Sequence, residues 1–265
     1  MPVPDRDRWL RAAVWSVVLP GVRARASRRL AALEAGVATV VTVNWNSAEQ
    51  LRTLLRLVRS RSPERTRILV VDNHSRDESR ALLSATPNVE AINLPINLGH
   101  DLALDIGFLS VRTEFVVALD VDAFPLHGEW LRELLQPLDS SATIAGARLN
   151  REYVHPCCLA MRTRTFVERK HSFRNRYRPR RDGKDASGDV GEIMSQRETP
   201  RLFFFDPTSQ RGPGDVGTVF GGLVYHNFYS TRFNGTDAAV LDGHVRQSDA
   251  EAAWNEAVER YGRET

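Results

Sequence analysis

The sequence predicts an α/β fold in which helices cover a mostly parallel sheet, with a smaller subdomain toward the C-terminus. In the first half, short apolar runs typical of strands alternate with stretches of helical periodicity, which is the rhythm of βαβ units. These runs contain few polar residues, as expected for strands that are buried on both faces. After Pro137 the rhythm breaks into shorter apolar pieces separated by loops rich in Gly, Pro and Arg. The four predicted strands are 38–43, 68–71, 89–94 and 115–119.

Capping boxes mark the predicted helix starts, because a Ser at the cap is followed three residues later by Glu or Gln. The last predicted helix places Trp254, Val258 and Tyr261 on one face and ends at Gly262, so we expect it to pack against the domain as a clasp. The pairs are Ser47 with Gln50, Ser75 with Glu78, and Ser248 with Glu251.

With 265 residues, the chain is long enough for one composite domain. The adjacent Cys157 and Cys158 suit neither a disulfide framework nor a C-x-x-C metal site, so we expect a reducing cytoplasm. We expect four parts: a helical extension over 1–36, an α/β half over 37–145, a second half with mobile loops over 146–235, and a C-terminal helix over 236–265.

The N-terminal segment is predicted to be an amphipathic helix. Its apolar stretch, Ala12–Leu19, is too short to span a bilayer. The arginine-rich run Arg23–Arg29 stands where a signal peptide would need a small-residue cleavage site. Two alternatives remain: the helix docks on its own domain, or it touches a membrane surface.

Polar residues follow all four predicted strands. In open α/β sheets ligands bind outside the carboxyl ends of the strands. One such strand end would indicate only a helix cap or a turn. Four in succession favour a ligand site. They are Asn44-Trp45-Asn46, Asp72-Asn73, Asn97-Leu98-Gly99 and Asp120-Val121-Asp122.

The Asp120-x-Asp122 pair points to a divalent cation. Two carboxylates on a tight turn after a buried strand suit Mg²⁺ or Mn²⁺ that also holds phosphate oxygens. The cation would supply the counter-charge that buried carboxylates need. A third ligand could come from His226, although a lone histidine is about as often a structural hydrogen-bonding group.

Neither common phosphate-binding loop stands at its expected place. The chain has no G-x-x-x-x-G-K-[ST] motif and no G-x-G-x-x-G after the first strand. A kinase, a P-loop ATPase and a Rossmann dehydrogenase are therefore disfavoured.

Taken together, these segments resemble the GT-A-fold glycosyltransferases of family 2. The matching segments are Val41–Ser47, Ile68–Asp77, Asn97–Gly107 and Val116–Asp122, in the family's order and spacing, with weaker echoes in His155–Met161, Gly188–Gly191 and Val224–Asn227. The resemblance implies an inverting enzyme that moves a sugar from a nucleoside-diphosphate sugar to the hydroxyl of a small-molecule or glycan acceptor, with Mn²⁺ or Mg²⁺ as cofactor.

The resemblance also assigns roles to individual residues. It implies that the Asn44–Asn46 turn and Asp72, with the adjacent Asn73, hold the base and ribose, and that Asn97 and Gly99 lie near the diphosphate and the sugar. By the same match Asp120 contacts the ribose or the metal, Asp122 binds the metal directly, His226 is the distal metal ligand, and Asp189 is the catalytic base.

The chain departs from the family pattern at two positions. It has Asp72-Asn73 where relatives usually have two acids. In the third matching segment, Asn97–Gly107, it has Asp105 where relatives often have an Asn before the last Gly. The base of the donor therefore stays open among UDP, dTDP and GDP. The Q-x-x-R-W motif of processive polysaccharide synthases is absent, which favours a single addition.

Two other functions stay open. A nucleotidyltransferase of similar fold should carry a glycine-rich, basic loop after its first strand, which Asn44–Ser47 is not. A non-catalytic sugar-nucleotide or glycan-binding protein would bind without turnover.

The catalytic base has several candidates in the sequence. Asp189 lies in a glycine-flanked turn, where the backbone can approach a ligand, but an ordinary Gly-Asp turn is an equal alternative. Glu192, Asp206 and Asp215 are reserves.

One basic run, Arg162–Lys184, contains only Glu168 and Asp182 as acids. It is a candidate lid, a membrane contact or a solvated loop. Aromatic residues among its arginines are compatible with single-stranded nucleic acid, but that reading leaves the strand ends unexplained, so no nucleic-acid partner is expected.

Overall fold

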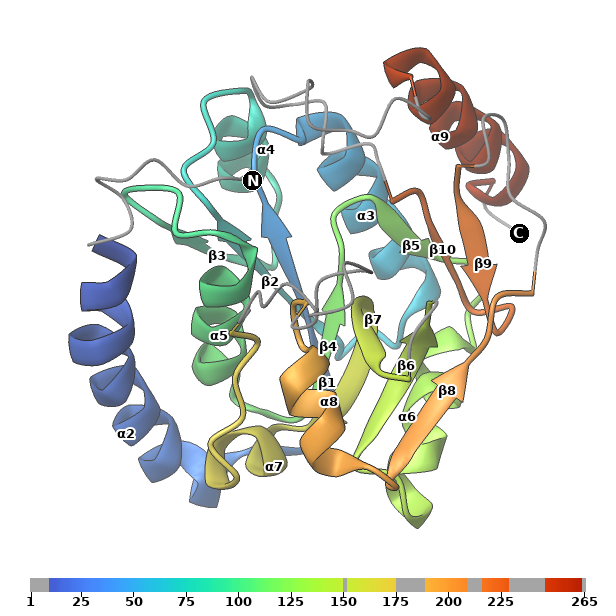
Figure 1. The fold of residues 1–265 in the computed structure, drawn as a ribbon. Coiled ribbons are helices and arrows are strands. Elements are labelled where there is room, and N and C mark those ends of the chain that lie inside the picture. Colours follow the sequence, from blue (N-terminus) through green and yellow to red (C-terminus); the bar gives the residue numbers. More distant parts are fainter. Residues whose placement is uncertain (1–9, 150–151, 175–188, 209–215, 229–245, 264–265) are drawn as a thin grey trace, which may run out of the picture.

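A seven-stranded sheet with the order β3-β2-β1-β4-β7-β6-β8 forms the centre of the protein (Figure 1). The computed structural model describes residues 10–149, 152–174, 189–208, 216–228 and 246–263. The four strands predicted from sequence are the parallel strands β1 to β4, so the predicted mostly parallel α/β fold is confirmed. The strands are β1 (Glu34–Asn44), β2 (Arg67–Asp72), β3 (Val89–Asn93), β4 (Thr113–Leu119), β6 (Ile144–Arg148), β7 (Val154–Arg162) and β8 (Leu202–Phe205).

Strand β7 runs against its neighbours. It pairs antiparallel with β4, with Leu119 opposite Cys158, and antiparallel with β6. The start of β7 therefore lies at the edge of the sheet where β1, β2 and β4 end. The expected boundary at residue 145 falls inside β6, and the sheet continues from one expected half into the other.

A second, three-stranded sheet lies beside the end of β4. It has the order β5-β10-β9 and consists of β5 (Ala123–Pro125), β9 (Thr218–Phe220) and β10 (Val224–His226). Strand β5 begins directly after the Asp120–Asp122 turn, and its Ala123 pairs with His226 of β10. This pairing brings two distant parts of the chain together.

Helices cover both faces of the main sheet, because successive strand residues point to opposite faces. Val40, Val70 and Val117 pack against one helical layer, α3 with α6. Val41, Leu69 and Val116 pack against the other, which contains α2, α5 and α7. The helices are α3 (Ala48–Arg61), α4 (Ser79–Ala85), α5 (His100–Ser110), α6 (Trp130–Ser140), α7 (Thr163–Glu168), α8 (Glu192–Glu198) and α9 (Gln247–Tyr261).

The N-terminal segment docks on the domain through one of its faces. It consists of a π-helical turn η1 (Val14–Val18), helix α2 (Leu19–Arg29) and a 3-10 turn η2 (Leu30–Ala32). Leu19, Ala26 and Leu30 are buried against the layer that contains α5. No helix in the described part of the chain is long and apolar enough to cross a membrane.

The predicted helices are present, but their predicted capping boxes are wrong. At the first helix, Ser47 donates its hydroxyl proton to the Trp45 carbonyl and does not cap α3. Instead, the carboxylate of Asp77 accepts hydrogen bonds from Ala48 N–H at the start of α3 and from Ser79 N–H at the start of α4. One side chain thus serves two helix starts, because the turns after β1 and β2 lie side by side.

The last helix, α9, packs as the predicted clasp. Its capping box involves Arg246 and Asp249, so the predicted pair at Ser248 and Glu251 is also wrong. Trp254 lies edge-on against Phe124, with ring centroids 5.5 Å apart, and belongs to a buried cluster that includes Tyr225. Helix α9 therefore packs on the small sheet, on the side of the molecule away from α2 (Figure 1).

Candidate functional site

The Asp120–Asp122 turn is fixed from three directions. The N–H of Asp120 donates to the Cys157 carbonyl on β7 at 3.2 Å, and the N–H of Ala123 donates back to the Asp120 carbonyl at 2.9 Å. From the small sheet, the N–H of Asn227 donates to the Asp122 carbonyl at 3.0 Å. The turn is thus held between the main sheet and β10, which sets the direction of both carboxylates.

Asp120, Asp122 and His226 form a compact cluster at this turn. Their ligand atoms lie within 4.8 Å of one another. The Nε2 atom of His226 is 3.2 Å from Asp122 Oδ1 and 3.4 Å from Asp120 Oδ2. Asp122 and His226 are each 3% exposed, so the contacts occur away from bulk water. The structure brings together the three residues that the sequence proposed as metal ligands.

The charges in the cluster compensate one another. Burial raises the pKa of Asp120, but hydrogen bonds from His100 and His226 outweigh it and hold that pKa well below its usual value. For His226, burial lowers the pKa, whereas the Cys157 thiol and the carboxylates of Asp122 and Asp120 raise it well above its usual value. A cationic partner is therefore strongly favoured beside the two carboxylates.

The donor set fits a divalent cation. Asp122 Oδ2 is buried and has no hydrogen-bond partner among the described residues. A buried carboxylate oxygen without a partner is costly, and a bound cation would supply that partner. Two carboxylates with one imidazole suit Mn²⁺, and Mg²⁺ when water or phosphate completes its shell.

His100 is a site residue that the sequence reasoning missed. It is the first residue of α5, and its Nε2 atom lies 3.4 Å from Asp120 Oδ1, on the carboxylate oxygen that His226 does not contact. Its side chain is 38% exposed, so part of it is accessible at the rim, the edge of the main sheet at which β1, β2 and β4 end. The sequence shows a histidine directly after Gly99, but its contact with Asp120 joins two separate segments, and no local pattern predicts it.

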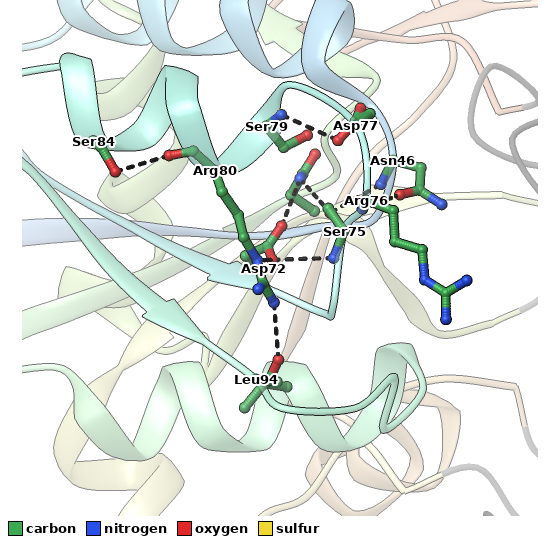
Figure 2. Close-up of polar contacts among 10 residues, drawn as sticks. Asn46, Asp72, Ser75, Arg76, Asp77, Ser79, Arg80, Ser84 and Leu94 are labelled. Atoms are coloured by element: carbon green, nitrogen blue, oxygen red, sulfur yellow. Dashed lines mark hydrogen bonds and ion pairs between the residues drawn. The ribbon is translucent and has the colours of Figure 1, made fainter.

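Asp72 lies at the centre of a network that fixes the neighbouring strand ends (Figure 2). Its Oδ1 accepts from Asn44 Nδ2 at 3.1 Å, and its Oδ2 accepts from Ser75 N–H and from Arg80 Nε. Burial raises the pKa of Asp72, but the hydrogen bonds from Ser75, Arg80 and Asn44 lower it below its usual value. Asp72 is fully buried, so in this structure it acts by fixing Asn44, Ser75 and Arg80 at the edge of the sheet. Direct contact with a nucleotide stays a prediction.

Ser75 acts in that network and not as the predicted helix cap. Its hydroxyl oxygen accepts from Asn44 Nδ2 and from the N–H of Asn46, both at 3.0 Å. Asn46, at φ 51°, in turn accepts from Arg76 N–H through its Oδ1. The Asn44–Asn46 turn is therefore tied to the turn after β2, as Figure 2 shows.

The third family-like segment, Asn97–Gly107, is also held by hydrogen bonds from a neighbouring strand end. Asn73 Nδ2 donates to Asn97 Oδ1 at 2.9 Å, and Asn73 Oδ1 accepts from Leu98 N–H at 2.8 Å. Gly99 follows with φ 84°, a conformation that favours glycine. The guanidinium of Arg11, from the N-terminal segment, would lie 2.8 Å from a Cβ on Gly99, and it pairs with Asp101 at 2.6 Å.

Asp189 lies just before α8 and is linked to the cluster of Asp120, Asp122 and His226 through intervening side chains. Its Oδ2 accepts from the Tyr153 hydroxyl at 2.8 Å, and its Oδ1 accepts from Val190 N–H. The Tyr153 ring contacts His155, whose ring centroid is 6.3 Å from that of His226. A chain of side chains at the start of β7 thus connects Asp189 to the cluster. Tyr153 and His155 were not identified from sequence.

The reserve bases differ in their surroundings. Glu192 accepts from Asp189 N–H at 2.9 Å and so supports the same turn. Asp206 is exposed and pairs with Arg148 at 2.7 Å. Asp215 and residues 175–184 of the basic run lie outside the described residues.

A cleft of about 710 Å³ opens next to the rim, between the start of α3 and α9. Asn46 and Asp77 line it from one side, and Gln247 and Trp254 line it from the other. None of the three clustered residues, Asp120, Asp122 and His226, lines this cleft. The cleft therefore adjoins the turn after β1, apart from the cluster.

Comparison with known proteins shows that other proteins of solved structure share this fold. Curated protein sequences give no match to the chain. Among solved structures, TarS of S. aureus superposes with a TM-score of 0.52, at 15% identity, over 84% of this chain and 43% of that chain. Its fragment 1–349 gives a TM-score of 0.51, at 14% identity, over 84% of this chain and 71% of that chain. At such identities the likeness shows a shared fold.

A third solved structure is more distant in shape. The mannosyltransferase PcManGT from Pyrobaculum calidifontis, in complex with GDP-Man and Mn²⁺, gives a TM-score of 0.44 at 17% identity over 64% of this chain. The match spans 59% of that protein, so this chain corresponds to somewhat more than half of its length.

A family model covers most of the site. The model of glycosyl transferase family 2 matches residues 39–198, which include part of β1, all of β2 to β4, Asp120, Asp122 and Asp189, but not His226. The match extends over more than half of the chain and contains the sheet edge where the cluster lies. The chain therefore belongs to glycosyl transferase family 2 and is a glycosyltransferase.

Proposed function

We propose that the protein transfers one sugar at a time, with inversion, from a nucleoside-diphosphate sugar to an acceptor hydroxyl in a metal-dependent reaction. The buried cluster of Asp120, Asp122 and His226 at the rim of the parallel strands is the observation that carries this proposal. The cluster places candidate cation ligands at the carboxyl ends of the parallel strands, where α/β proteins bind nucleotides.

The metal ligands in this proposal are Asp122 and His226, with Asp120 shared between the metal and His100. A bound Mn²⁺ or Mg²⁺ neutralises the charge that develops on the departing diphosphate. His100 stands on the outer side of Asp120, where its side chain can donate to a phosphate oxygen or keep Asp120 oriented.

Asp189 is the proposed general base. The acceptor oxygen forms a bond to the anomeric carbon, the bond from that carbon to the diphosphate oxygen breaks, and the hydroxyl proton passes to the Asp189 carboxylate. The Tyr153 hydroxyl donates to Asp189 Oδ2 and fixes the carboxylate for this step.

The donor is proposed to be a UDP-, dTDP- or GDP-sugar, held at the Asn44–Asn46 turn and the third motif. TarS has been solved in complex with UDP, which supports a nucleotide of this class. The acceptor is a small molecule or a glycan, and the reducing cytoplasm is the proposed compartment, in keeping with two free, buried cysteines.

A donor screen tests the proposal. The full chain is incubated with UDP-, dTDP- and GDP-sugars and Mn²⁺, and released nucleoside diphosphate is measured beside a thermal-shift assay. A fitting donor should stabilise the fold by about 3 kcal/mol at about a hundred times its Kd. Asp122→Asn should abolish the metal-dependent part of the shift, and Asp206→Asn, an exposed acid in an ion pair, should leave it unchanged.

Other outcomes of the screen decide against the proposal. A donor-dependent shift without release of diphosphate would indicate a binding protein. In a parallel incubation with a nucleoside triphosphate and a sugar phosphate, release of pyrophosphate would indicate a nucleotidyltransferase. If the Mn²⁺-dependent thermal shift persists in Asp122→Asn, the cluster of Asp120, Asp122 and His226 does not bind the metal.

A further inference from the structure

The outward face of the N-terminal helical segment is apolar along most of its length. Exposed apolar residues recur at every third or fourth position from Leu10 to Ala24, and Ser16 is the one exposed polar residue among the described residues of this stretch. Three large aliphatic side chains stand out, since Leu10 is 48%, Val17 74% and Val18 49% exposed. The residues of this outer stripe are Leu10, Ala13, Val17, Pro20 and Ala24, flanked by Val18 and Gly21. A surface helix normally presents polar residues outward, so the stripe calls for a partner.

The helix cannot hide the stripe by rotating. Its other face is fixed by the buried Leu19, Ala26 and Leu30. Arg23 donates to the His171 carbonyl at 2.7 Å, and Arg11 pairs with Asp101 at 2.6 Å. Helix α2 lies at the outer edge of the molecule (Figure 1). Because the stripe residues are exposed while the opposite face is buried, the stripe faces away from the domain.

The flank of the stripe is positively charged. From Leu10 to Leu33 the sequence contains five arginines and no acid, and Arg25 and Arg28 are exposed. Lys170 and Arg174, which follow α7, lie on the same side, with the Arg174 guanidinium 5.2 Å from the Trp15 ring centroid. The nearby acid, Glu168, pairs with Arg164 at 2.8 Å.

A groove of about 420 Å³ runs between α2 and α7 along this flank. Its walls include Trp15, Leu19 and Pro20, and it also contains Arg23 and Lys170. Apolar walls with cationic groups beside them match a surface on which acyl chains and anionic headgroups meet.

We propose that this face docks on the surface of an anionic lipid bilayer. The stripe is the convex side of a helix, which a flat lipid surface accommodates, whereas a protein partner would need a matching groove. A second copy of the chain would present the same arginine-rich helix, and like charges would oppose the contact. The proposal does not rest on sugar transfer, and its test measures binding alone.

The test is co-sedimentation of the full chain with vesicles. Vesicles of equal parts phosphatidylcholine and phosphatidylglycerol should bind the protein, and vesicles of pure phosphatidylcholine should bind it far less. Added salt should weaken the binding, because it screens the arginines. Arg25→Gln and Arg28→Gln should each weaken it about fivefold, and Val17→Asp about tenfold or more.

Matched control variants distinguish docking through this face from non-specific adsorption to vesicles. Phe203, which is 44% exposed on β8, and Arg132, exposed on α6, lie away from α2. Phe203→Asp and Arg132→Gln should bind as the unmodified protein does, and circular dichroism melts should show that all variants are folded. Failure of the unmodified protein to bind, equal binding by Val17→Asp, or equal losses in the two controls would overturn the proposal. So would a concentration-dependent dimer that Val17→Asp abolishes.

Discussion

The carboxylate of Asp189 is the group on which the rate of transfer should depend. If it is the base, Asp189→Asn should lower kcat about 100- to 10,000-fold, because proton removal from the acceptor loses its catalyst. The asparagine keeps an oxygen that can accept from Tyr153, so donor binding and the Mn²⁺-dependent thermal shift should persist. Initial rates at saturating donor measure the effect.

Comparison of acids around α8 identifies the base. Asp206→Asn should leave kcat unchanged, since that exposed side chain pairs with Arg148. Near-normal transfer by Asp189→Asn with an intact metal response would assign the proton transfer elsewhere, with Glu192 as the next residue to test.

Asp105 makes the stability of the fold depend on pH. Burial raises the pKa of Asp105 to about 7, although Phe173 N–H and the Ser172 hydroxyl donate to it and Arg23 lies near. The folded state therefore holds this proton up to a higher pH than the unfolded chain does. The stabilising contribution is complete below about pH 4 and is lost as the pH rises to about 7, by about 1 kcal/mol per pH unit.

The variant Asp105→Asn isolates that contribution, because its amide is neutral at every pH. The difference in unfolding free energy between the variant and the unmodified protein should move in favour of the variant from about pH 4 to about 7 and then level off. Urea unfolding at several pH values measures it. A difference that does not vary with pH would show that Asp105 stays charged in the fold.

Single residues also show where sequence reasoning reached its limit. The D-x-D turn was identifiable because both carboxylates are local to one strand end. The contact of His100 with Asp120 could not be identified in this way, because it joins residues from two separate segments. The capping prediction at Ser75 was wrong because Asn44 and Asn46 compete for its hydroxyl. Likewise, a polar strand end does not tell whether Asp72 faces solvent or, as here, is buried.

Helix α5 must approach the sheet closely, and Gly107 permits it. A Cβ at this position would stand 2.6 Å from Val41 Cγ1 and 3.1 Å from Val71 Cγ2. Gly107→Ala should therefore lower the free energy of unfolding by about 1 to 3 kcal/mol, although alanine is the better helix former. Chemical unfolding monitored by circular dichroism measures the change.

Gly21 in α2 is the matched control, because no atom lies within 4 Å of a Cβ placed there. Gly21→Ala should raise the free energy of unfolding by about 0.5 to 1 kcal/mol, as expected for a helix interior. Changes of the same sign in both variants would argue against close packing of α5 on β1 and β2.

The order of elements was largely predictable, and their partners in space were not. Strands β1 to β4 and helix α9 follow from local periodicity and end within a few residues of the predicted positions. The antiparallel entry of β7 and the pairing of β5 with β10 depend on contacts between segments far apart in sequence. No local pattern encodes such pairings.

The proposed metal site joins residues from both sheets, so its geometry depends on the clasp helix. Asn227 follows His226, donates through Nδ2 to the Ala250 carbonyl on α9 at 3.0 Å, and accepts from the Tyr225 hydroxyl at 2.7 Å. Asn227→Ala should weaken Mn²⁺ binding about tenfold, because support of a ligand from behind commonly has an effect of this size. Isothermal titration calorimetry measures the affinity.

Asn255→Ala is the control on the same helix, since Asn255 is exposed and outside that network. Its Mn²⁺ affinity should equal that of the unmodified protein. If Asn227→Ala bound Mn²⁺ normally while Asp122→Asn did not, His226 would be held independently of α9.

The reversed direction of β7 also determines how an enzyme of this build can acquire a new specificity. Because β7 enters the sheet at the edge where β4 ends, its first side chains point to the cluster: the His155 ring lies beside that of His226, and the Tyr153 ring beside that of His155. Substitutions at these two positions would change the surroundings of the cluster while every strand keeps its pairing. Divergence toward another acceptor then requires no new scaffold, only different side chains at the start of a strand whose position is already set.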